Sequence, residues 1–142
     1  MTHPLAIITG GAQGIGRATV ELLLDEGWRV AALDRDPEAV AELDADYPEA
    51  TLLAVAVDVS DELQVKEAFQ HLTDWQQEND QSTGVDLLVN NAGYGAMGPI
   101  LDADRDTLLK QFDTNVFAPL QLVRDSADLL RTAKGLIVNI GS

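Results

Sequence analysis

Five short apolar runs, rich in leucine and β-branched residues, alternate along the chain with segments whose apolar residues recur at helical spacing. Within each run the apolar residues are consecutive, which is typical of parallel strands covered on both faces by helices. The sequence therefore predicts an α/β fold with a doubly wound parallel sheet, whose strands are Leu5–Ile8, Arg29–Leu33, Thr51–Val57, Val85–Val89 and Gly135–Ile140.

The first two segments between these runs predict helices. Asp36 and Pro37 are the residue types of a helix N-cap and a first helical residue, so a second helix is expected from there to about Asp46. The first helix is expected to end at Gly27. Its predicted sheet-facing stripe consists of residues at helical spacing, namely Ile15, Ala18, Thr19, Leu22 and Leu23.

The third helix is expected to have Ser60 as its cap. The polar run from Gln76 to Gly84 is interpreted as its frayed end followed by a solvent loop. The residues predicted to be buried along this helix are Val65, Ala68, Phe69 and Leu72.

A fourth helix is predicted from about Arg105 to Leu130, with Pro119 inside it. Because proline has no backbone N–H, the carbonyl oxygen of Asn115 loses its ordinary helical donor. We therefore expect a kink at this position, with that oxygen able to accept a hydrogen bond from water. A kink that serves only to bend the helix is the alternative.

A glycine-rich segment follows the first predicted strand directly. Residues 9–16 read Thr-Gly-Gly-Ala-Gln-Gly-Ile-Gly and lead into the first predicted helix. Glycines let the backbone approach a pyrophosphate closely, and the N–H groups at the helix start favour its negative charge. No Lys-Ser or Lys-Thr pair follows, which argues against a Walker-type nucleoside triphosphatase. The candidate binding residues here are Gly10, Gly14, Ile15 and Gly16.

Asp34 closes the second predicted strand. In dinucleotide-binding folds, the carboxylate that binds the adenosine ribose follows the glycine-rich turn by roughly 20 residues. Asp34 follows the turn by about that number. This carboxylate would repel a 2′-phosphate, which favours NAD over NADP. Arg35 and Arg17 oppose that interpretation, because either guanidinium could bind a 2′-phosphate with two hydrogen bonds. NADP therefore stays open as the less favoured cofactor.

Further short motifs follow the later strands. The turn has the pattern T-G-x-x-x-G-x-G, Asp58-Val59 follows the third strand, and Asn90-Asn91-Ala92-Gly93 follows the fourth. Asn115 lies in the fourth helix, and Asn139-Ile140-Gly141-Ser142 follows the fifth strand. In this order, and over the whole chain, the motifs resemble those of the short-chain dehydrogenase/reductase family. The resemblance implies a Rossmann fold with strand order 3-2-1-4-5, in which residues 1–142 form an incomplete NAD(P)-binding domain.

The resemblance also implies roles for residues around a cofactor. Asp58 would hydrogen-bond the adenine amino group and Val59 would contact the same ring, while Asn90 braces the sheet. Gln13 stands where NADP-preferring relatives often carry a basic residue, which again favours NAD. The segment expected to line the cofactor is Asn91, Ala92 and Gly93. A purely structural role remains the alternative for Asp34, Asp58 and Asn90. Tyr94 and Met97 are interpreted as ordinary loop residues at the cleft mouth.

Two catalytic residues are implied by the same resemblance. Ser142 matches the family's serine that orients the substrate oxygen, and Asn115 matches the asparagine whose backbone carbonyl holds a water in the proton relay. The family's acid–base pair is Tyr-x-x-x-Lys. It does not occur here, because Tyr47 is followed four residues later by Thr51, and Tyr94 by Gly98.

Two functional hypotheses follow. The first is an NAD-dependent oxidoreductase that transfers hydride between nicotinamide and a secondary alcohol or carbonyl substrate, of which this chain is the nucleotide-binding half. It would lack the sixth and seventh strands of the family fold, which leaves the fifth strand as a bare sheet edge. The second is a dinucleotide-binding module without turnover. A flavodoxin-like or receiver-like binding domain is a more distant alternative.

Composition limits the partners. The chain has 142 residues, 9 Lys+Arg against 24 Asp+Glu, and a formal net charge of −15. This charge argues against nucleic acid and anionic membranes. The absence of cysteine excludes disulfides and thiolate metal sites and fits a cytoplasmic location. No membrane partner and no metal are expected, and His3 and His71 are interpreted as solvated. A small-molecule substrate and a homo-oligomeric full-length protein, dimer or tetramer, are implied by the resemblance.

Overall fold

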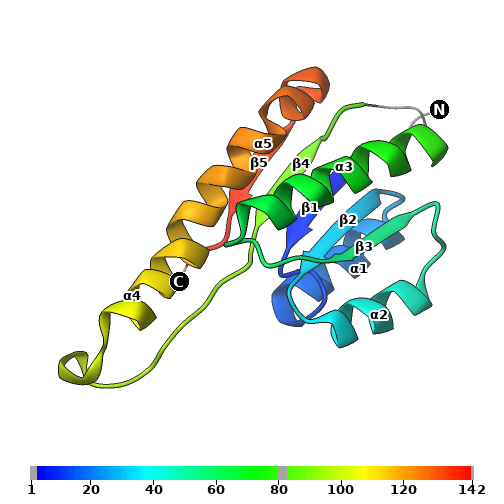
Figure 1. Cartoon of the computed structure of the whole chain (residues 1–142). Coiled ribbons are helices and arrows are strands. Elements are labelled where there is room, and N and C mark those ends of the chain that lie inside the picture. The colour runs from blue at the N-terminus through cyan, green and yellow to red at the C-terminus, as the bar shows by residue number, and fades with distance from the viewer. Residues whose placement is uncertain (1–2, 80–82, 142) are drawn as a thin grey trace.

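The computed structural model describes residues 3–79 and 83–141. Five parallel strands form one sheet in the order β3-β2-β1-β4-β5, as predicted (Figure 1). The strands are β1 Leu5–Thr9, β2 Arg29–Asp34, β3 Leu52–Ala56, β4 Leu87–Asn90 and β5 Leu136–Asn139. The α-helices are α1 Gly14–Asp25, α2 Pro37–Asp46, α3 Glu62–Asn79, α4 Arg105–Phe112 and α5 Ala118–Ala133.

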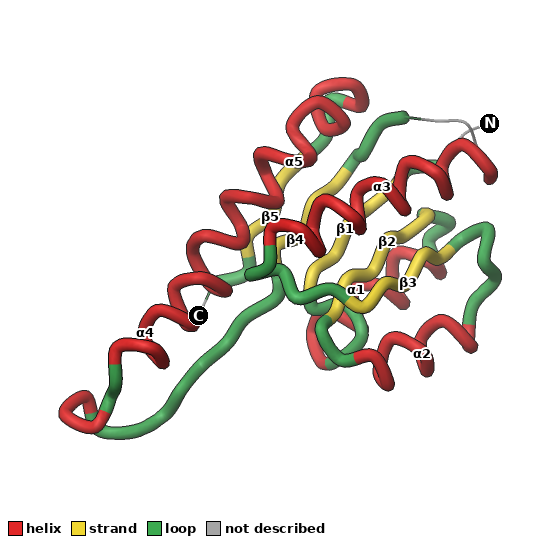
Figure 2. The backbone as a smooth tube through the Cα atoms, in the orientation of Figure 1, coloured by secondary structure: helices red, strands yellow, loops and turns green. Residues whose placement is uncertain are grey.

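Helices cover the two faces of the sheet in pairs (Figure 2). In β1, Leu5 and Ile7 belong to the core under α3 and α5, whereas Ala6 and Ile8 belong to the core under α1 and α2. Both sets are nearly inaccessible to solvent. Because successive side chains of a strand point to opposite faces, a strand with helices on both sides must be apolar throughout. This explains the consecutive apolar residues from which the fold was predicted.

The fifth strand differs from the central ones. Within the described part of the chain β5 pairs only with β4, and all four of its residues are exposed. Leu136 is 69% exposed and Val138 is 40% exposed, although both are apolar. The expectation of burial on both faces is therefore wrong for β5, and the expectation of a bare sheet edge is met in the described residues.

Helix α1 faces the sheet with only part of its predicted stripe, since Leu23 packs against the core but other members of the stripe do not. Ile15 and Leu22 are 67% and 60% exposed, and Ala18 is exposed as well. The buried residues are Gly16 and Val20. A Cβ at residue 16 would collide with the carbonyl oxygen of Gly10, so the helix packs against the end of β1 through its glycine. Gly27 ends the helix region at φ +85°, as expected.

The beginning and the end of α3 both differ from the prediction. The cap is Asp61 instead of Ser60, because the Asp61 carboxylate accepts hydrogen bonds from the N–H groups of Leu63 and Gln64. The Ser60 hydroxyl instead donates to Asp58. The helix continues to Asn79 through the segment that we interpreted as frayed.

Gln76 accounts for the longer helix. Its side chain is buried, and Nε2 donates a hydrogen bond of 3.1 Å to the carbonyl oxygen of Gly84. Val65, Ala68 and Leu72 are buried as predicted, whereas Phe69 is half-buried. The polar amide can thus be buried in the core, because it donates a hydrogen bond to the backbone that precedes β4.

The predicted fourth helix is divided. α4 is followed by a π-helical segment, Asp113–Phe117, and then by α5, in which Pro119 lies in the first turn. Asn115 is at the centre of the π-helical segment. The irregularity expected from Pro119 is therefore present, as a wider turn that separates two helices. No helix among the described residues combines the length and the apolar character that crossing a membrane requires.

The N-cap of α3 gives a direct test of these contacts. Asp61→Ala should lower the free energy of unfolding by about 1 kcal/mol, because it leaves two backbone N–H groups without their acceptor. Ser60→Ala is the matched control and should change it by less than about 0.5 kcal/mol. Urea unfolding followed by circular dichroism measures both, and equal losses would contradict the assignment of the cap.

Candidate functional site

A crevice of about 260 Å³ opens at the carboxyl ends of β1 to β4. Most of the predicted cofactor residues line it, together with Gln13, Leu33, Val57 and Thr114. They are Gly10, Gly14, Asp34, Arg35, Asp58, Val59, Asn91, Ala92 and Gly93. Gly16 is buried beside the crevice, and Ile15 lines a neighbouring one. The sheet therefore gathers residues that are far apart in sequence at one edge.

The glycine-rich turn forms one wall of this crevice. Gly14 is at φ +55°, and a Cβ there would meet no other atom within 4 Å, so that side of the residue is open space. Gly16 brings the first turn of α1 against the carbonyl of Gly10. The start of a helix and an open approach to its backbone are the two features that suit a pyrophosphate.

The turn is joined to β2 by consecutive hydrogen bonds. The N–H of Gly11 donates to the carbonyl of Leu33 at 3.2 Å, and the N–H of Ala12 donates to Oδ2 of Asp34 at 3.0 Å. The other oxygen of Asp34 accepts the N–H of Asp36 at 3.1 Å. Asp34 is 8% exposed, and backbone N–H groups hold both oxygens of its carboxylate, so its position in the crevice is fixed.

Thr9 holds the residues of the opposite wall in place, although it was not among the site residues expected from the sequence. Its hydroxyl is buried and accepts the N–H groups of Asn91 and Ala92, each at 3.0 Å. The side chain of Asn91 donates back to the carbonyl oxygens of Thr9 and Gly10. A threonine at the end of an apolar strand was the available signal, because a buried hydroxyl needs partners.

A second, larger crevice of about 760 Å³ adjoins the first. Asn115 and Pro119 line it from the π-helical segment and α5, and Ile140 lines it from the end of β5. Asn90 and Asn139, which are paired across β4 and β5, also line it and share a hydrogen bond of 3.0 Å. Because this second crevice adjoins the first, the two crevices together form one continuous candidate site.

The side chain of Asn115 has a structural task that the sequence did not reveal. Its Oδ1 accepts the N–H of Tyr94 at 2.8 Å, and its Nδ2 donates to the carbonyl of Tyr94 at 2.7 Å. This pair of bonds ties the loop after β4 to the π-helical segment. The backbone carbonyl of Asn115 is a separate acceptor. It receives no hydrogen bond from Pro119, because proline has no backbone N–H.

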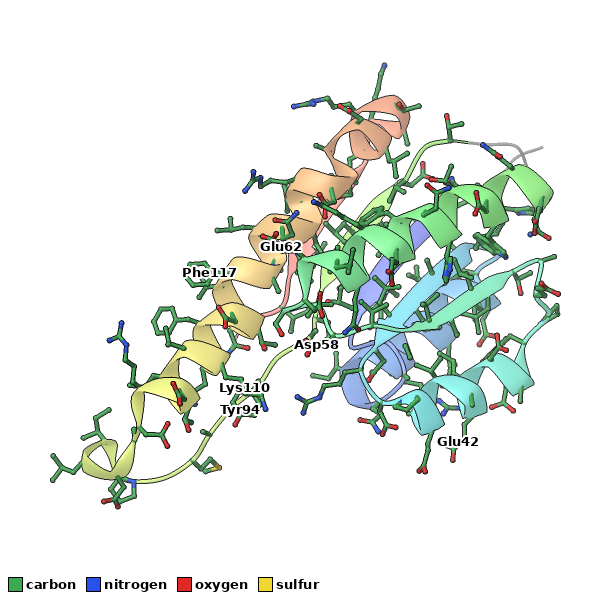
Figure 3. All side chains as sticks on the ribbon, viewed as in Figure 1. Glu42, Asp58, Glu62, Tyr94, Lys110 and Phe117 are labelled. Carbon is green, nitrogen blue, oxygen red and sulfur yellow. The ribbon has the colours of Figure 1, made fainter. Side chains whose placement is uncertain are left out.

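Tyr94 is more than the ordinary loop residue that we expected. Its ring is half-buried, with the Lys110 ammonium 4.4 Å and the Arg35 guanidinium 5.9 Å from the ring centroid. Figure 3 shows Lys110 beside Tyr94. These cation–π contacts connect α4 and the end of β2 to the loop. Met97, by contrast, is fully exposed.

The arginines near the crevice have different environments. Arg17 forms ion pairs with Glu21 at 3.0 Å and with Asp46 at 3.1 Å. The hydrogen bond that Arg17 donates to Glu21, with the nearby negative charges, raises the pKa of Arg17. Arg35 lines the crevice and contacts Tyr94. Arg35 is therefore the basic side chain available to a ligand there, whereas Arg17 is engaged by carboxylates.

Asp58 and Ser142 complete the predicted set. Asp58 is exposed, lines the first crevice, and uses Oδ1 to accept hydrogen bonds from the backbone and hydroxyl of Ser60. Ser142 lies outside the described residues. Across the described ranges, 3–79 and 83–141, no three acidic or histidine side chains gather in a way that could hold a metal ion.

Comparison with known proteins agrees with this architecture. The sequence profile of the short chain dehydrogenase family matches residues 4–142, and the chain belongs to that family. It is 35% identical over 144 residues to the short-chain dehydrogenase ptmH of Penicillium ochrochloron, covering 100% of this chain and 50% of that one. It is 33% identical over 139 residues to a diacetyl reductase, (S)-acetoin forming, of Staphylococcus epidermidis, covering 94% and 51%.

Solved structures give the same result. The crystal structure of a short-chain dehydrogenase from Streptomyces avermitilis superimposes with a TM-score of 0.87 at 29% identity, covering 100% of this chain and 50% of that one. The chain thus spans about half the length of the relatives it matches. Members of this family are oxidoreductases that use nicotinamide dinucleotides, and the crevice described above lies where a doubly wound sheet binds its ligand.

The Thr9 hydroxyl can be tested without changing the shape of the side chain. Thr9→Val should lower the free energy of unfolding by about 1–3 kcal/mol, because two buried N–H groups lose their acceptor. Thr9→Ser, which keeps the hydroxyl, should lose less. Urea unfolding measures the cost, and hydrogen exchange at Asn91 and Ala92 should rise in the valine variant. An equal loss in both variants would contradict this role.

Proposed function

We propose that the chain binds NAD as part of an oxidoreductase that transfers hydride between nicotinamide and a secondary alcohol or carbonyl substrate. The observation that carries the proposal is the Asp34 carboxylate. It is nearly buried at the end of β2, fixed by two backbone N–H groups, and lines the crevice beside the glycine-rich turn. A carboxylate in this place suits the hydroxyls of the adenosine ribose.

The residues around the crevice fit such a cofactor. Each oxygen of an ionised carboxylate has more than one acceptor site, so Asp34 can accept ribose hydroxyls while it keeps its backbone partners. Gly14 leaves its side of the turn open, and α1 begins there, which suits the pyrophosphate. Asp58 and Val59 line the wall proposed for adenine.

The charges support NAD as the favoured dinucleotide. A 2′-phosphate near Asp34 would meet a carboxylate. Of the two arginines that could offset this, Arg17 is paired with Glu21 and Asp46. Arg35 remains, so NADP stays the less favoured alternative.

The second crevice is the proposed place of the reaction. A bound nicotinamide supplies the hydride acceptor or donor. Asn115 holds the loop after β4 through its side chain, and its backbone carbonyl can accept a hydrogen bond from a water of the proton relay. Ser142 ends a motif that resembles one of the family's motifs. On that resemblance, Ser142 is proposed to orient the substrate oxygen.

The wider biology is also proposed from the family. A diacetyl reductase among the relatives supports a small carbonyl or alcohol substrate. We further propose a cytoplasmic homo-oligomer, with no nucleic-acid or membrane partner, in keeping with the net charge of −15.

A second candidate function is dinucleotide binding without turnover by the 142-residue chain. The observation in its favour is that neither Tyr47 nor Tyr94 has a lysine four residues later. The two candidates are separated by steady-state assays with NAD or NADH and a panel of secondary alcohols and ketones. We expect binding without turnover from this chain. Turnover by a preparation of verified mass would contradict the second candidate and support the first.

The cofactor assignment has its own test. Asp34→Asn should weaken NAD binding about tenfold or more, because a charged acceptor of the ribose hydroxyls is replaced by a neutral one. Binding of NADP should fall less, since repulsion of its phosphate is relieved. Asp44→Asn, an exposed carboxylate of α2, is the charge-matched control and should change neither. Isothermal titration calorimetry measures both dissociation constants. An unchanged preference would mean that Asp34 does not contact the ribose.

A further inference from the structure

We propose that the side chain of Tyr94 is a gate over the path between the two crevices, held shut by its cation–π contact with Arg35. The inference rests on the proposed function, in which one dinucleotide occupies both crevices. Arg35 lines the first crevice and Tyr94 lines the second. The Arg35 guanidinium is 5.9 Å from the centroid of the Tyr94 ring, so their contact lies where the two crevices adjoin.

This contact spans the glycine-rich turn. In the sheet, β1 lies between β2 and β4, and the turn follows β1. Arg35 directly follows β2, whereas Tyr94 belongs to the loop after β4. Their side chains therefore meet across the carboxyl end of β1, beside the start of α1 that is proposed to hold the pyrophosphate. A ligand that extends from one crevice to the other has to cross this line.

The backbone of Tyr94 is fixed. Asn115 accepts a hydrogen bond from its N–H at 2.8 Å and donates one to its carbonyl oxygen at 2.7 Å. Two residues further on, the carbonyl oxygen of Ala96 accepts a hydrogen bond of 3.3 Å from Nε2 of Gln111 in α4. The loop therefore stays attached to the helices on that side of the site, and opening has to come from rotation of the Tyr94 side chain.

The ring itself is held by weaker contacts. Besides Arg35, the Lys110 ammonium of α4 lies 4.4 Å from the ring centroid (Figure 3). The residues on either side of Tyr94 are glycines, so no adjacent side chain restricts the rotation. Cation–π contacts of partly exposed rings are weak, and breaking them leaves the backbone hydrogen bonds intact. A fixed backbone that carries a weakly held ring suits a gate.

A gate of this kind changes rates and leaves affinity as it is. Because the ring lies across the path, a dinucleotide enters only while the ring is turned away, and it leaves by the same route. Both rate constants are therefore multiplied by the same open fraction, and the dissociation constant, which is their ratio, does not change. A side chain that contacts the ligand directly changes the dissociation constant instead, mostly through the dissociation rate.

The first test removes the ring. Tyr94→Leu abolishes both cation–π contacts while the backbone keeps its bonds to Asn115. We expect the association and dissociation rate constants of NADH each to rise about fivefold, with the dissociation constant unchanged within about twofold. Tyr94→Phe keeps the aromatic face and should match the wild type. Stopped-flow fluorescence of NADH with the full 142-residue chain measures the rates, and calorimetry measures the dissociation constant.

The second test acts from outside the crevices. Lys110 contacts the ring but is not part of the lining of either crevice. Lys110→Met removes one of the two cations, so both rate constants should rise about twofold. Lys66→Met, at an exposed position of α3, is the matched control and should change neither. The rates are measured at about 0.3 M salt, where long-range attraction of NADH is screened. If Tyr94→Leu fails to fold by circular dichroism, Lys110→Met decides the outcome.

The outcomes are distinct from those for the proposed function. Equal rises of the two rate constants in Tyr94→Leu and Lys110→Met, with Tyr94→Phe and Lys66→Met unchanged, support the gate. Unchanged rates, the same rise in either control, or a dissociation constant that moves more than about threefold overturns it, while NADH binding by the wild type still stands. If the wild-type chain binds neither NAD nor NADH, the proposed function itself fails and the inference with it.

Discussion

The close contact between the start of α1 and the end of β1 is the constraint on which the site depends. Residue 16 lies so near the carbonyl of Gly10 that only a hydrogen atom fits in place of a side chain. This contact sets the direction in which α1 leaves the sheet, and with it the position of the open turn at Gly14. The Asp34 carboxylate and the Thr9 hydroxyl then fasten the two sides of that turn to β2 and to the loop after β4.

The alternation of strands and helices could be read from the sequence because it depends on local patterns. Consecutive apolar residues marked the strands, and Asp36 with Pro37 marked the start of α2. The motifs at successive strand ends gave the candidate site, since parallel strands bring their carboxyl ends to one edge. Strand direction predicts that these motifs meet at one edge, whereas the roles of Asp58 and of residues 91–93 were implied by the family resemblance.

The errors arose where a contact between distant segments decided the outcome. The apolar stripe of α1 was counted correctly, but the glycine contact rotates the helix so that Ile15 lines the second crevice. A count of hydrophobic residues gives glycine no weight. Ser60 and Asp61 are both suitable caps, and the choice follows from the hydrogen bond between Ser60 and Asp58. The partners of Thr9 lie more than 80 residues away, and the hydrogen bonds between Asn115 and Tyr94 span 21 residues.

An acidic chain that is proposed to bind a diphosphate raises an electrostatic question. With a net charge of −15, the 142-residue chain repels anions, so its long-range field does not help the ligand to approach. The turn itself contains no lysine or arginine before Arg17, and Arg17 is neutralised by Glu21 and Asp46. Backbone N–H groups and the dipole of α1 must therefore supply the local attraction. These dipoles are fixed by the fold and act over the length of one helical turn. In the proposed complex, the Asp34 carboxylate would thus select among dinucleotides by repulsion, while binding of the shared diphosphate would be left to the backbone.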